Sequence, residues 1–469
     1  MRGRVYTSGG ASSREKLEEE TFTIDDDISH LTKISSEPCE NVRKAMPNER
    51  TKPIPMIKML SGREFNYSGR GRFSLADCSY LLGRCLPVNL CSNERMDSEA
   101  YVSQFSSDGS LFIVGCRRSH IRIYNVDSGW KVQKDISARS LRWTITDTSL
   151  SPDKRFLVYS SLTPIVHIVN VGTPETESRA NITDIHDGLD FSDHVDSEYS
   201  FGIFSVKFST DGRELVAGSN SDSIHVYDLE ANKMTLQFPA HTTDVNTVTF
   251  ADETGHLIFS GSDDNLCKVW DRRCFVSTRK PAGILTGHLE GITFIDSRGD
   301  GRYFISNGKD QTTKLWDIRR MSSTPKFCSI CSCSSAPKLF SWDYRWDEFP
   351  AEARRQKHPS DQSVATYRGH SVLCTLIRCY FSPAYSTGQK YIYTGSNDGY
   401  VYIYDVVTGA TVARLKQHDA TVRDCSWHPY FPMLVSSSWD CSFARWEFPG
   451  NGADPVLHKK NRRRRSLRP

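Results

Sequence analysis

Four sets of polar residues recur at matching offsets in the second half of the 469-residue chain. In each set an Asp stands six residues before a Trp or Tyr, a Ser or Thr stands four residues before the Asp, and a His lies upstream. Ser, His and Asp side chains that meet in space can form a hydrolase triad. A catalytic site is normally unique, however, whereas a structural network repeats with its fold, so four copies predict four buried hydrogen-bond networks. The sets are His241, Ser260, Asp264 and Trp270; His288, Ser306, Asp310 and Trp316; His370, Thr394, Asp398 and Tyr404; and His418, Ser436, Asp440 and Trp446.

Other signatures of catalysis are missing from the sequence. It has no G-x-S-x-G elbow, no H-E-x-x-H pair and no phosphate-binding loop that ends in G-K-[ST]. We therefore expect a protein without a catalytic site or a cofactor.

A cysteine cluster, Cys328, Cys331 and Cys333, lies upstream of His358. The first pair has the spacing of zinc ligands, but a structural zinc site needs four convergent ligands, and a single C-x-x-C is weak evidence. The first twenty residues lack the apolar core of a signal peptide, which favours the cytosol or nucleus and reduced thiols. Reduced thiols in an irregular loop are the favoured interpretation, and metal binding by the three cysteines stays open.

The end of the chain is strongly basic. The chain has a net charge of +3, and segment 459–469 alone carries +7. The rest of the chain is therefore mildly acidic, at −4, and a poor surface for nucleic acids. We expect no direct nucleic-acid binding and no membrane span, because no stretch approaches the roughly 20 apolar residues of a membrane helix. A nuclear import signal is the first interpretation of the tail, with a nucleic-acid patch or a solvated tail as alternatives, and we expect a protein of the nucleus and cytoplasm. The proposed import residues are Lys459, Lys460, Arg462, Arg463, Arg464 and Arg465.

A repeat organises the middle of the chain. A dipeptide at the end of a short β-rich run recurs seven times, at spacings of 45, 58, 43, 46, 88 and 42 residues, and four of these match the period of a WD-type blade. Asp-Gly turns such as Asp108-Gly109 separate the runs. We predict an all-β fold, a seven-bladed WD-repeat β-propeller over 98–448, with a long insertion at about 321–366. The first three units lack the polar sets, so we expect them to be less regular. The dipeptides begin at Tyr124, Val169, Tyr227, Trp270, Trp316, Tyr404 and Trp446.

The regions around the propeller have a different character. Residues 1–70 combine acidic runs and prolines with few aromatics, which predicts a largely disordered N-terminal region. Residues 71–97 are predicted to hold a short amphipathic helix, at 74–87, and a linker, because apolar residues recur at helical spacing after the capping pair Ser74 and Asp77. Residues 449–469 form the basic tail.

Two arginines, Arg273 and Arg319, follow the Asp of successive Trp-Asp dipeptides by two residues. Being at the ends of equivalent strands in adjacent blades, they should emerge on one face and close together. Local pairing with acidic side chains is one interpretation. The other is a bidentate docking pair for the carboxylates or carbonyls of a partner.

The segments 258–273 and 304–319 resemble the box that marks WD-repeat substrate receptors of cullin-four RING ubiquitin ligases. These receptors dock on the damaged-DNA-binding protein one adaptor. The resemblance implies that Arg273 and Arg319 contact the adaptor and that Asp264 and Asp310 support them. The departures from the box are mild: Cys267, Asn307 and Thr313.

A narrower set of strings resembles the eleventh associated factor of that ligase and plant LEC-type WD-repeat proteins. It covers about residues 70–448 and includes part of the long insertion. The strings are Trp342-Asp343-Tyr344-Arg345-Trp346, Tyr367-Arg368-Gly369-His370, Phe381-Ser382-Pro383, and Val422-Arg423-Asp424-Cys425-Ser426-Trp427-His428-Pro429.

The resemblance implies a non-catalytic subunit that recruits protein substrates to the adaptor and the cullin-four ligase. The alternative is a WD-repeat scaffold of a nuclear chromatin or RNA-processing complex, because one fold hosts many functions. The 74–87 helix has two interpretations, a contact with the adaptor or packing on the chain's own propeller. The sequence does not name the substrate or the propeller surface that binds it.

Deleting 459–469 should shift a fluorescent fusion of the protein out of the nucleus, because the import residues all lie in this segment. Folding should be unaffected, since the segment lies beyond the last predicted blade and its one large apolar residue is Leu467. Fluorescence microscopy checks the distribution, and an equal nuclear signal with and without the segment would remove the import interpretation.

Overall fold

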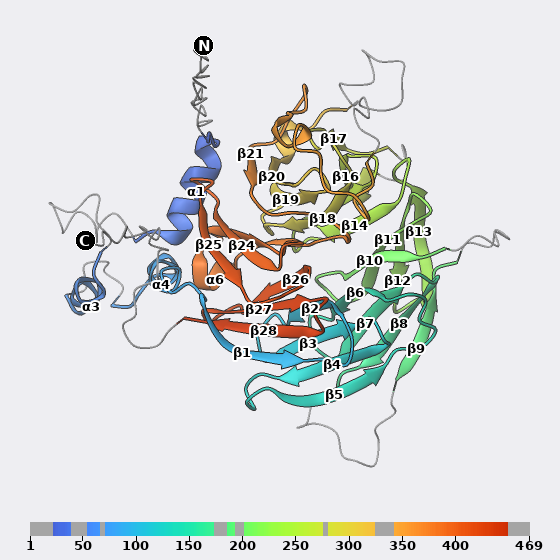
Figure 1. Cartoon of the computed structure of the whole chain (residues 1–469), viewed down its shortest axis with the longest axis horizontal. Helices are drawn as coiled ribbons and strands as arrows, with labels where there is room; N and C mark the ends of the chain where they lie inside the picture. The colour runs from blue at the N-terminus through green and yellow to red at the C-terminus, as the bar shows by residue number, and fades with distance from the viewer. Residues whose placement is uncertain are drawn as a thin grey trace, which may run out of the picture.

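The computed structural model describes residues 22–38, 54–65, 71–172, 185–192, 201–274, 280–323 and 342–448. These residues form seven four-stranded antiparallel sheets that are arranged as blades around one axis (Figure 1). The predicted all-β, seven-bladed propeller is confirmed.

The first four blades each take their strands in chain order, from the inner strand to the outer one. Their strands are β2 (Ala100–Phe105), β3 (Leu111–Cys116), β4 (His120–Asn125) and β5 (Lys131–Ser137); β6 (Ile145–Leu150), β7 (Phe156–Ser161), β8 (Ile165–Asn170) and β9 (His186–Asp190); β10 (Ile203–Phe208), β11 (Glu214–Ser219), β12 (Ser223–Asp228) and β13 (Lys233–Pro239); and β14 (Val245–Phe250), β15 (Leu257–Ser262), β16 (Cys267–Asp271) and β17 (Gly283–Leu285).

Blades five and six follow the same order, and blade seven has three strands from the end of the chain and one from before blade one. Their strands are β18 (Ile292–Ser297), β19 (Tyr303–Gly308), β20 (Thr312–Asp317) and β21 (Ala365–Arg368); β22 (Cys379–Phe381), β23 (Tyr391–Thr394), β24 (Tyr400–Asp405) and β25 (Thr411–Lys416); and β26 (Val422–Trp427), β27 (Met433–Ser438), β28 (Ser442–Glu447) and β1 (Asn89–Arg95).

The outer strand of blade seven closes the ring. Strand β1 pairs antiparallel with β28, from Asn89 opposite Glu447 to Arg95 opposite Ser442. The predicted boundary at residue 98 is therefore wrong, because the predicted linker contains this strand. Strand β1 is mostly exposed and polar, and an outer strand with one covered face has no apolar run that would identify it.

An Asp-Gly turn brings the two ends of the ring together. Gly109 has a φ of +76°, and a Cβ at this position would lie 2.2 Å from Nε2 of His428 in blade seven. Only glycine suits both the left-handed backbone and the close approach. The predicted turn at Asp108-Gly109 is thus also a contact between the first blade and the last.

The inner strands also meet through a buried ion network. The fully buried Asp147 accepts hydrogen bonds from Arg378 Nη2 (2.8 Å) and Lys207 Nζ (3.1 Å), and Arg378 Nη1 lies 3.4 Å from Asp424. Burial by itself would raise the pKa of Asp147, but the charges of Arg378 and Lys207 outweigh it and lower that pKa. This network connects blades two, three, six and seven.

Blades one to three are as complete as the others, so the prediction that they are less regular is wrong. Other contacts take the place of the missing polar sets. In blade two the rings of Tyr159 and His167 stack at 5.1 Å, and between blades one and seven Phe112 packs on Phe443 at 5.7 Å. Backbone ladders and aromatic packing therefore suffice to build a regular blade.

The N-terminal region, predicted to be largely disordered, contains two helices in its described residues 22–38 and 54–65. Helix α1 (Asp26–Ser36) begins after the N-cap Asp25, and helix α3 (Met56–Glu64) follows Pro55. Ile28 of α1 is fully buried in the core shared by blades five and six, and the Phe22 ring lies 5.6 Å from that of Tyr367. The low average hydrophobicity of the region hides these few apolar residues, which pack on the propeller.

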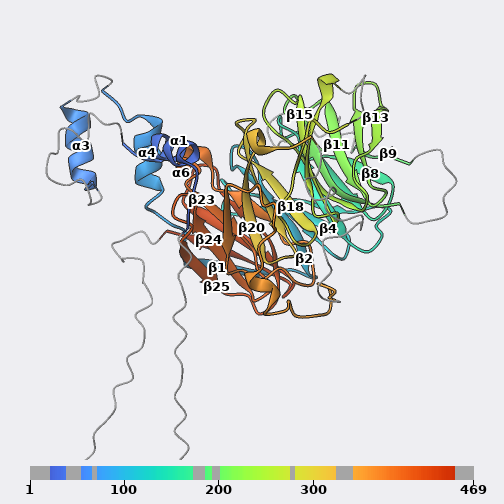
Figure 2. The ribbon, with the colours of Figure 1, turned by 90° about the horizontal axis from the view of Figure 1, so that it is seen from above.

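The helix predicted after Ser74 is confirmed as α4 (Leu75–Leu82), with a capping box between Ser74 and Asp77. It packs on blade six through the short helix α6 (Ala384–Thr387), where Ser79 Oγ donates to the carbonyl of Tyr385 (3.0 Å). The structure thus supports the interpretation that this helix packs on its own propeller. Figure 2 shows α1, α3 and α4 together at one side of the ring.

The predicted polar networks form in blades four, five and seven. In blade four the Trp270 indole donates to the Ser260 hydroxyl (2.8 Å), which contacts His241 Nε2 (2.8 Å). The other ring nitrogen, Nδ1, lies 2.8 Å from the Asp264 carboxylate. An indole N–H only donates, so the hydroxyl donates onward to Nε2 and Nδ1–H donates to the Asp. The same contacts, at 2.6–3.2 Å, join His288, Ser306, Asp310 and Trp316, and His418, Ser436, Asp440 and Trp446.

The charges of these groups fit this chain of donors. Burial lowers the pKa of His241, even with the Asp264 carboxylate beside it, so the imidazole is neutral at pH 7. Burial would raise the pKa of Asp440, but hydrogen bonds from His418 and Ser442 outweigh it and hold that pKa at about 2. A neutral imidazole between a hydroxyl and a carboxylate satisfies every member of the set.

The predicted network in blade six is wrong. His370 contacts the Tyr404 hydroxyl through Nδ1 (3.1 Å) and Asn307 through Nε2 (2.8 Å). The Thr394 hydroxyl donates to the carbonyl of Arg378 (2.9 Å), and Asp398 accepts from Tyr402 (2.8 Å). A phenol hydroxyl reaches the imidazole directly, so Thr394 and Asp398 have no place in the chain of donors.

Replacing Asp310 with Ala should lower the melting temperature, because it leaves the buried His288 and the backbone N–H of Leu289 without their acceptor. An unpaired buried donor costs about 1–3 kcal/mol of unfolding free energy. Asp398→Ala is the matched control: this exposed carboxylate stands at the same repeat position but has no hydrogen bond with the buried His370, so its loss should cost less. Calorimetry of both variants checks the difference, and equal losses would contradict the assignment.

Candidate protein-docking site

Arg273 lies in the 3-10 turn η1 (Arg272–Cys274), directly after β16. The Asp271 carboxylate accepts hydrogen bonds from the backbone N–H of Arg273 (3.0 Å) and from its Nε (2.9 Å) and Nη2 (2.7 Å). The hydrogen bond from Arg273 lowers the pKa of Asp271, so the pair is charged at neutral pH. The arginine side chain is 63% exposed, and the clamp fixes one edge of its guanidinium while Nη1 has no hydrogen bond with any described residue.

Arg319 repeats this geometry in the next blade, in the turn η2 (Ile318–Arg320) after β20. Asp317 accepts from the backbone N–H of Arg319 (2.9 Å) and from its Nε (3.1 Å) and Nη2 (3.0 Å). This side chain is 57% exposed. Both arginines leave the same end of equivalent strands, so the prediction of an exposed pair on one face is confirmed. Local pairing with an acid, the other interpretation, is also present.

The carboxylates that hold the two arginines are Asp271 and Asp317. Asp264 and Asp310, which the resemblance gave this supporting role, instead belong to the buried networks. Asp264 and Asp310 precede β16 and β20, whereas Arg273 and Arg319 follow these strands. Each Asp is thus at the opposite end of the strand from the arginine that it was expected to support. The supporting role of Asp264 and Asp310 is corrected accordingly.

Helix α1 adds two acidic side chains to this face. Asp27 accepts hydrogen bonds from Nη2 of Arg319 (2.7 Å) and of Arg302 (2.9 Å), and Asp25 accepts from Arg320 (2.9 Å). These contacts were missed because α1 lies in the region predicted to be disordered. The alternation of Phe22, Ile24 and Ile28 with an acidic run was the available signal in the sequence.

The helices beside this face expose large apolar side chains. Ile57 of α3 is 77% exposed, and Ile34 of α1 and Leu75 of α4 are also exposed. Helix α3 is tied to α4 by hydrogen bonds of the Ile54 backbone with Tyr80 (2.8 Å) and Arg84 (2.9 Å). Exposed apolar groups gathered on the helices at one side of a propeller are typical of a protein-protein contact.

The same sequence pattern occurs a third time in the long insertion, as Trp342-Asp343-Tyr344-Arg345. Arg345 donates from Nε (3.0 Å) and Nη2 (2.8 Å) to Asp343, as Arg273 does to Asp271. The carbonyl of Tyr344 accepts from Cys374, in the connection before blade six, which lies on the face opposite Arg273 and Arg319. Arg345 thus has the same Asp clamp as Arg273 and Arg319, but it lies on the opposite face of the propeller.

The residues predicted for metal binding and for nuclear import are not part of this face. Cys328, Cys331 and Cys333, and the import residues of the tail, lie outside the described residues. His358 is buried, and its Nδ1 accepts from the backbone of Ser360 (3.1 Å). In the part of the chain that the structure describes, no three His, Cys, Asp or Glu side chains gather as metal ligands and no helix has the length and hydropathy of a membrane span.

Known proteins resemble this chain along most of its length. LEC14B protein of Lithospermum erythrorhizon is 65% identical over 443 residues, which cover 94% of this chain and 92% of the relative. The DDB1- and CUL4-associated factor 11 homolog of Caenorhabditis elegans is 35% identical over 427 residues, which cover 87% and 72%. This chain belongs to the LEC14B and DDB1- and CUL4-associated factor 11 family.

Two family models agree with the WD-repeat fold of this family. A model described as Nucleolar protein 10-like, N-terminal domain, matches residues 100–333, and the WD domain, G-beta repeat, matches 361–405 and 409–447. The resemblance to WD-repeat proteins of cullin-four ligases, stated from the sequence, is confirmed at the level of the family.

Proposed function

We propose that this chain is the substrate-recognition subunit of a cullin-four RING ubiquitin ligase and has no catalytic role of its own. It would dock the DDB1 adaptor and present protein substrates for ubiquitination. The observation that carries the proposal is the pair of clamped arginines, Arg273 and Arg319, at equivalent positions of adjacent blades, in a chain whose relatives are named for DDB1 and CUL4.

The clamps suit the arginines for docking. Each Asp holds one edge of a guanidinium, so little side-chain freedom remains to be lost when a partner binds. Nη1 of each arginine has no hydrogen bond with the described residues and can donate to carbonyls or carboxylates of the adaptor. Arginine is over-represented among the residues that dominate interfaces. The exposed apolar residues of α1, α3 and α4 support a second contact beside the arginines.

The rival function is a scaffold of a nuclear chromatin or RNA-processing complex. The match of residues 100–333 to the Nucleolar protein 10-like model favours it. The relatives named for the ligase match 87% and 94% of this chain, which favours the receptor. A location in both nucleus and cytoplasm, with import through the basic tail, is compatible with either.

The double variant Arg273→Ala with Arg319→Ala should lose adaptor binding by roughly tenfold or more, because both docking guanidiniums are removed. Its melting temperature should stay near that of wild type, since exposed ion pairs contribute little to stability. Co-purification with DDB1 and cullin-four, and titration with purified DDB1, measure the loss.

Arg345→Ala is the matched control, because it removes an arginine with the same Asp clamp on the opposite face. It should bind the adaptor as wild type does. Full binding by the double Ala variant, or no recovery of DDB1 by the wild type, would reject the receptor function in favour of the scaffold.

Asp27→Asn should strengthen adaptor binding about two- to five-fold, because the Asp27 carboxylate occupies Arg319 in the free protein and an exposed ion pair of this kind is weak. Asp26→Asn removes the same charge one residue earlier, from an exposed side chain without a hydrogen bond to the described residues, and should leave binding unchanged. Titration of both variants with DDB1 gives the comparison, and equal affinities would show that α1 does not compete.

A further inference from the structure

The face opposite the arginine pair carries an exposed tryptophan in a strained loop. Trp143 lies in the connection from blade one to blade two, has a φ of 71°, and is 54% exposed. A bulky residue in the left-handed region is rare and persists only where its surroundings hold it. Because the strands of a blade are antiparallel, the connection before the inner strand and the turn after the third strand lie at opposite ends of the blade. The loop of Trp143 is therefore on the other face from the turns that carry Arg273 and Arg319.

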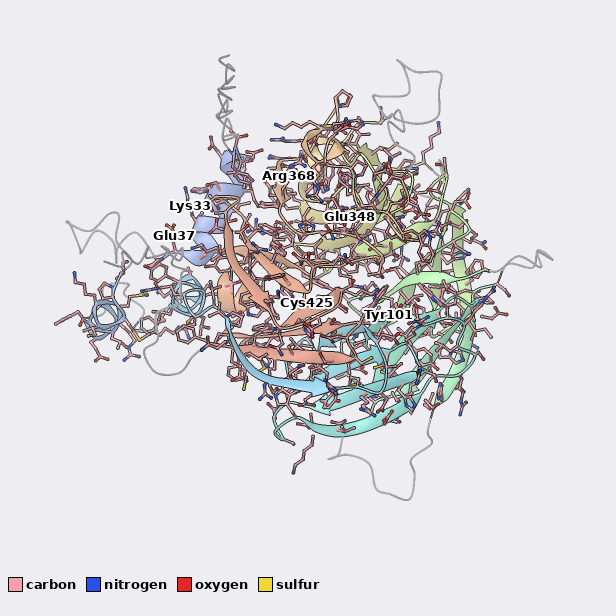
Figure 3. The ribbon with its side chains drawn as sticks, in the orientation of Figure 1. Lys33, Glu37, Tyr101, Glu348, Arg368 and Cys425 are labelled. Atoms are coloured by element: carbon pink, nitrogen blue, oxygen red, sulfur yellow. The ribbon has the colours of Figure 1, made fainter. Side chains whose placement is uncertain are left out.

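Neighbouring contacts hold the loop in place. The backbone N–H of Ala138 donates to Ser119 (2.6 Å), and that of Arg139 donates to the Tyr159 hydroxyl (2.8 Å). The Trp143 ring packs edge-on against Tyr101 at 6.0 Å, and Tyr101 stacks on Trp439 of blade seven at 5.4 Å. Tyr101 is at the inner end of its blade, near the axis (Figure 3). The exposed indole is thus the outer member of a fixed aromatic row across blades two, one and seven.

Two arginines beside this row lack an acidic partner. Arg118 and Arg142 are exposed, and no carboxylate of the described residues lies within ion-pair distance of either. The acidic side chains nearby are already engaged: Glu99 pairs with Arg117 (3.1 Å), and Asp97 and Asp135 pair with Arg122 (2.6 and 3.1 Å). The surface therefore combines an anchored apolar ring with uncompensated positive charge.

We propose that Trp143, Arg142 and Arg118 form a docking surface for an acidic segment of a target protein in which apolar residues stand next to Asp or Glu. The indole would cover an apolar side chain, and the two guanidiniums would bind the carboxylates beside it. Exposed Trp and Arg are the residue types that dominate protein interfaces. That the bound protein is a substrate rests on the proposed ligase function; the binding itself does not.

The charge of the chain favours a protein segment over a nucleic acid. Nucleic acids need a continuous basic surface along the phosphate backbone. Here two free arginines stand among paired charges, in a chain that is net acidic before its tail. A short acidic peptide requires no more positive charge than this.

Selection of a random peptide library on the full-length chain, followed by anisotropy titration of the labelled peptides that emerge, tests the proposal. The test variant is Arg142→Ser with Trp143→Asn, because Asn tolerates the left-handed backbone that Trp143 adopts. The control variant is Arg155→Ser with Val132→Asn, which likewise replaces an exposed arginine with Ser and an exposed apolar residue with Asn, in the turn before β7 and on β5.

The selected peptides should carry Asp or Glu next to Leu, Ile, Phe or Trp, should bind the control variant as they bind wild type, and should bind the test variant at least tenfold more weakly. Arg118→Ser should weaken them further, and exchange of their acids for amides should abolish binding. No enrichment, enrichment without acids, or equal binding by the test variant would overturn the proposal, as would tighter binding of labelled single-stranded RNA at this loop.

Because no adaptor is present in this titration, its failure leaves adaptor docking intact. Conversely, suppose that acidic peptides bind the chain but the chain does not co-purify with DDB1. The docking surface would then stand and the ligase function would be rejected.

Discussion

The pairing of β1 with β28 is the constraint on which the rest of the molecule depends. A row of blades has two unpaired edges, and only a strand from one end added to the sheet at the other end removes them. Closure fixes the angle between neighbouring blades, and with it the position of Arg273 relative to Arg319. It also brings His428 onto Gly109, and it places Trp439 of the last blade against Tyr101 of the first. The aromatic row under Trp143 therefore includes a contact that exists only in the closed ring.

Antiparallel order gives the ring two chemically different faces. In blades four and five, the turns after the third strands each carry an Asp and an Arg that hold each other, so these charges are fixed and exposed on that face. The connections before the inner strands carry the buried histidines and, in one loop, an exposed Trp143. Between these faces, the buried ion network around Asp147 and Arg378 connects blades two, three, six and seven. Helix α1 contacts the arginine face through Asp27, and its Ile28 packs in the core shared by blades five and six.

Repetition explains what could be predicted from the sequence. The dipeptides, the turns at Asp108 and its equivalents, and three of the four His networks follow from a pattern that each blade repeats. Three of the failures are at positions where one contact overrides the pattern. Tyr404 replaces an indole with a phenol that reaches His370 directly, and the polar strand β1 is recognisable only by its partner β28. Ile28 packs in a core cluster whose other members lie far along the chain, such as Phe294 and Tyr404. The arginine pair was found from spacing, but its clamp by Asp271 and Asp317 depends on a turn geometry that spacing does not contain.

The closing strand has a consequence for how the protein is made. On the ribosome β1 is among the first strands to emerge, and its partner β28 begins almost 350 residues later. At about 5–20 residues per second, the two are separated by roughly 20–70 seconds of synthesis. During that time the growing sheets end in an open edge of the kind that promotes aggregation. A stalled or truncated message would release a chain in which β1 has no partner and the ring stays open.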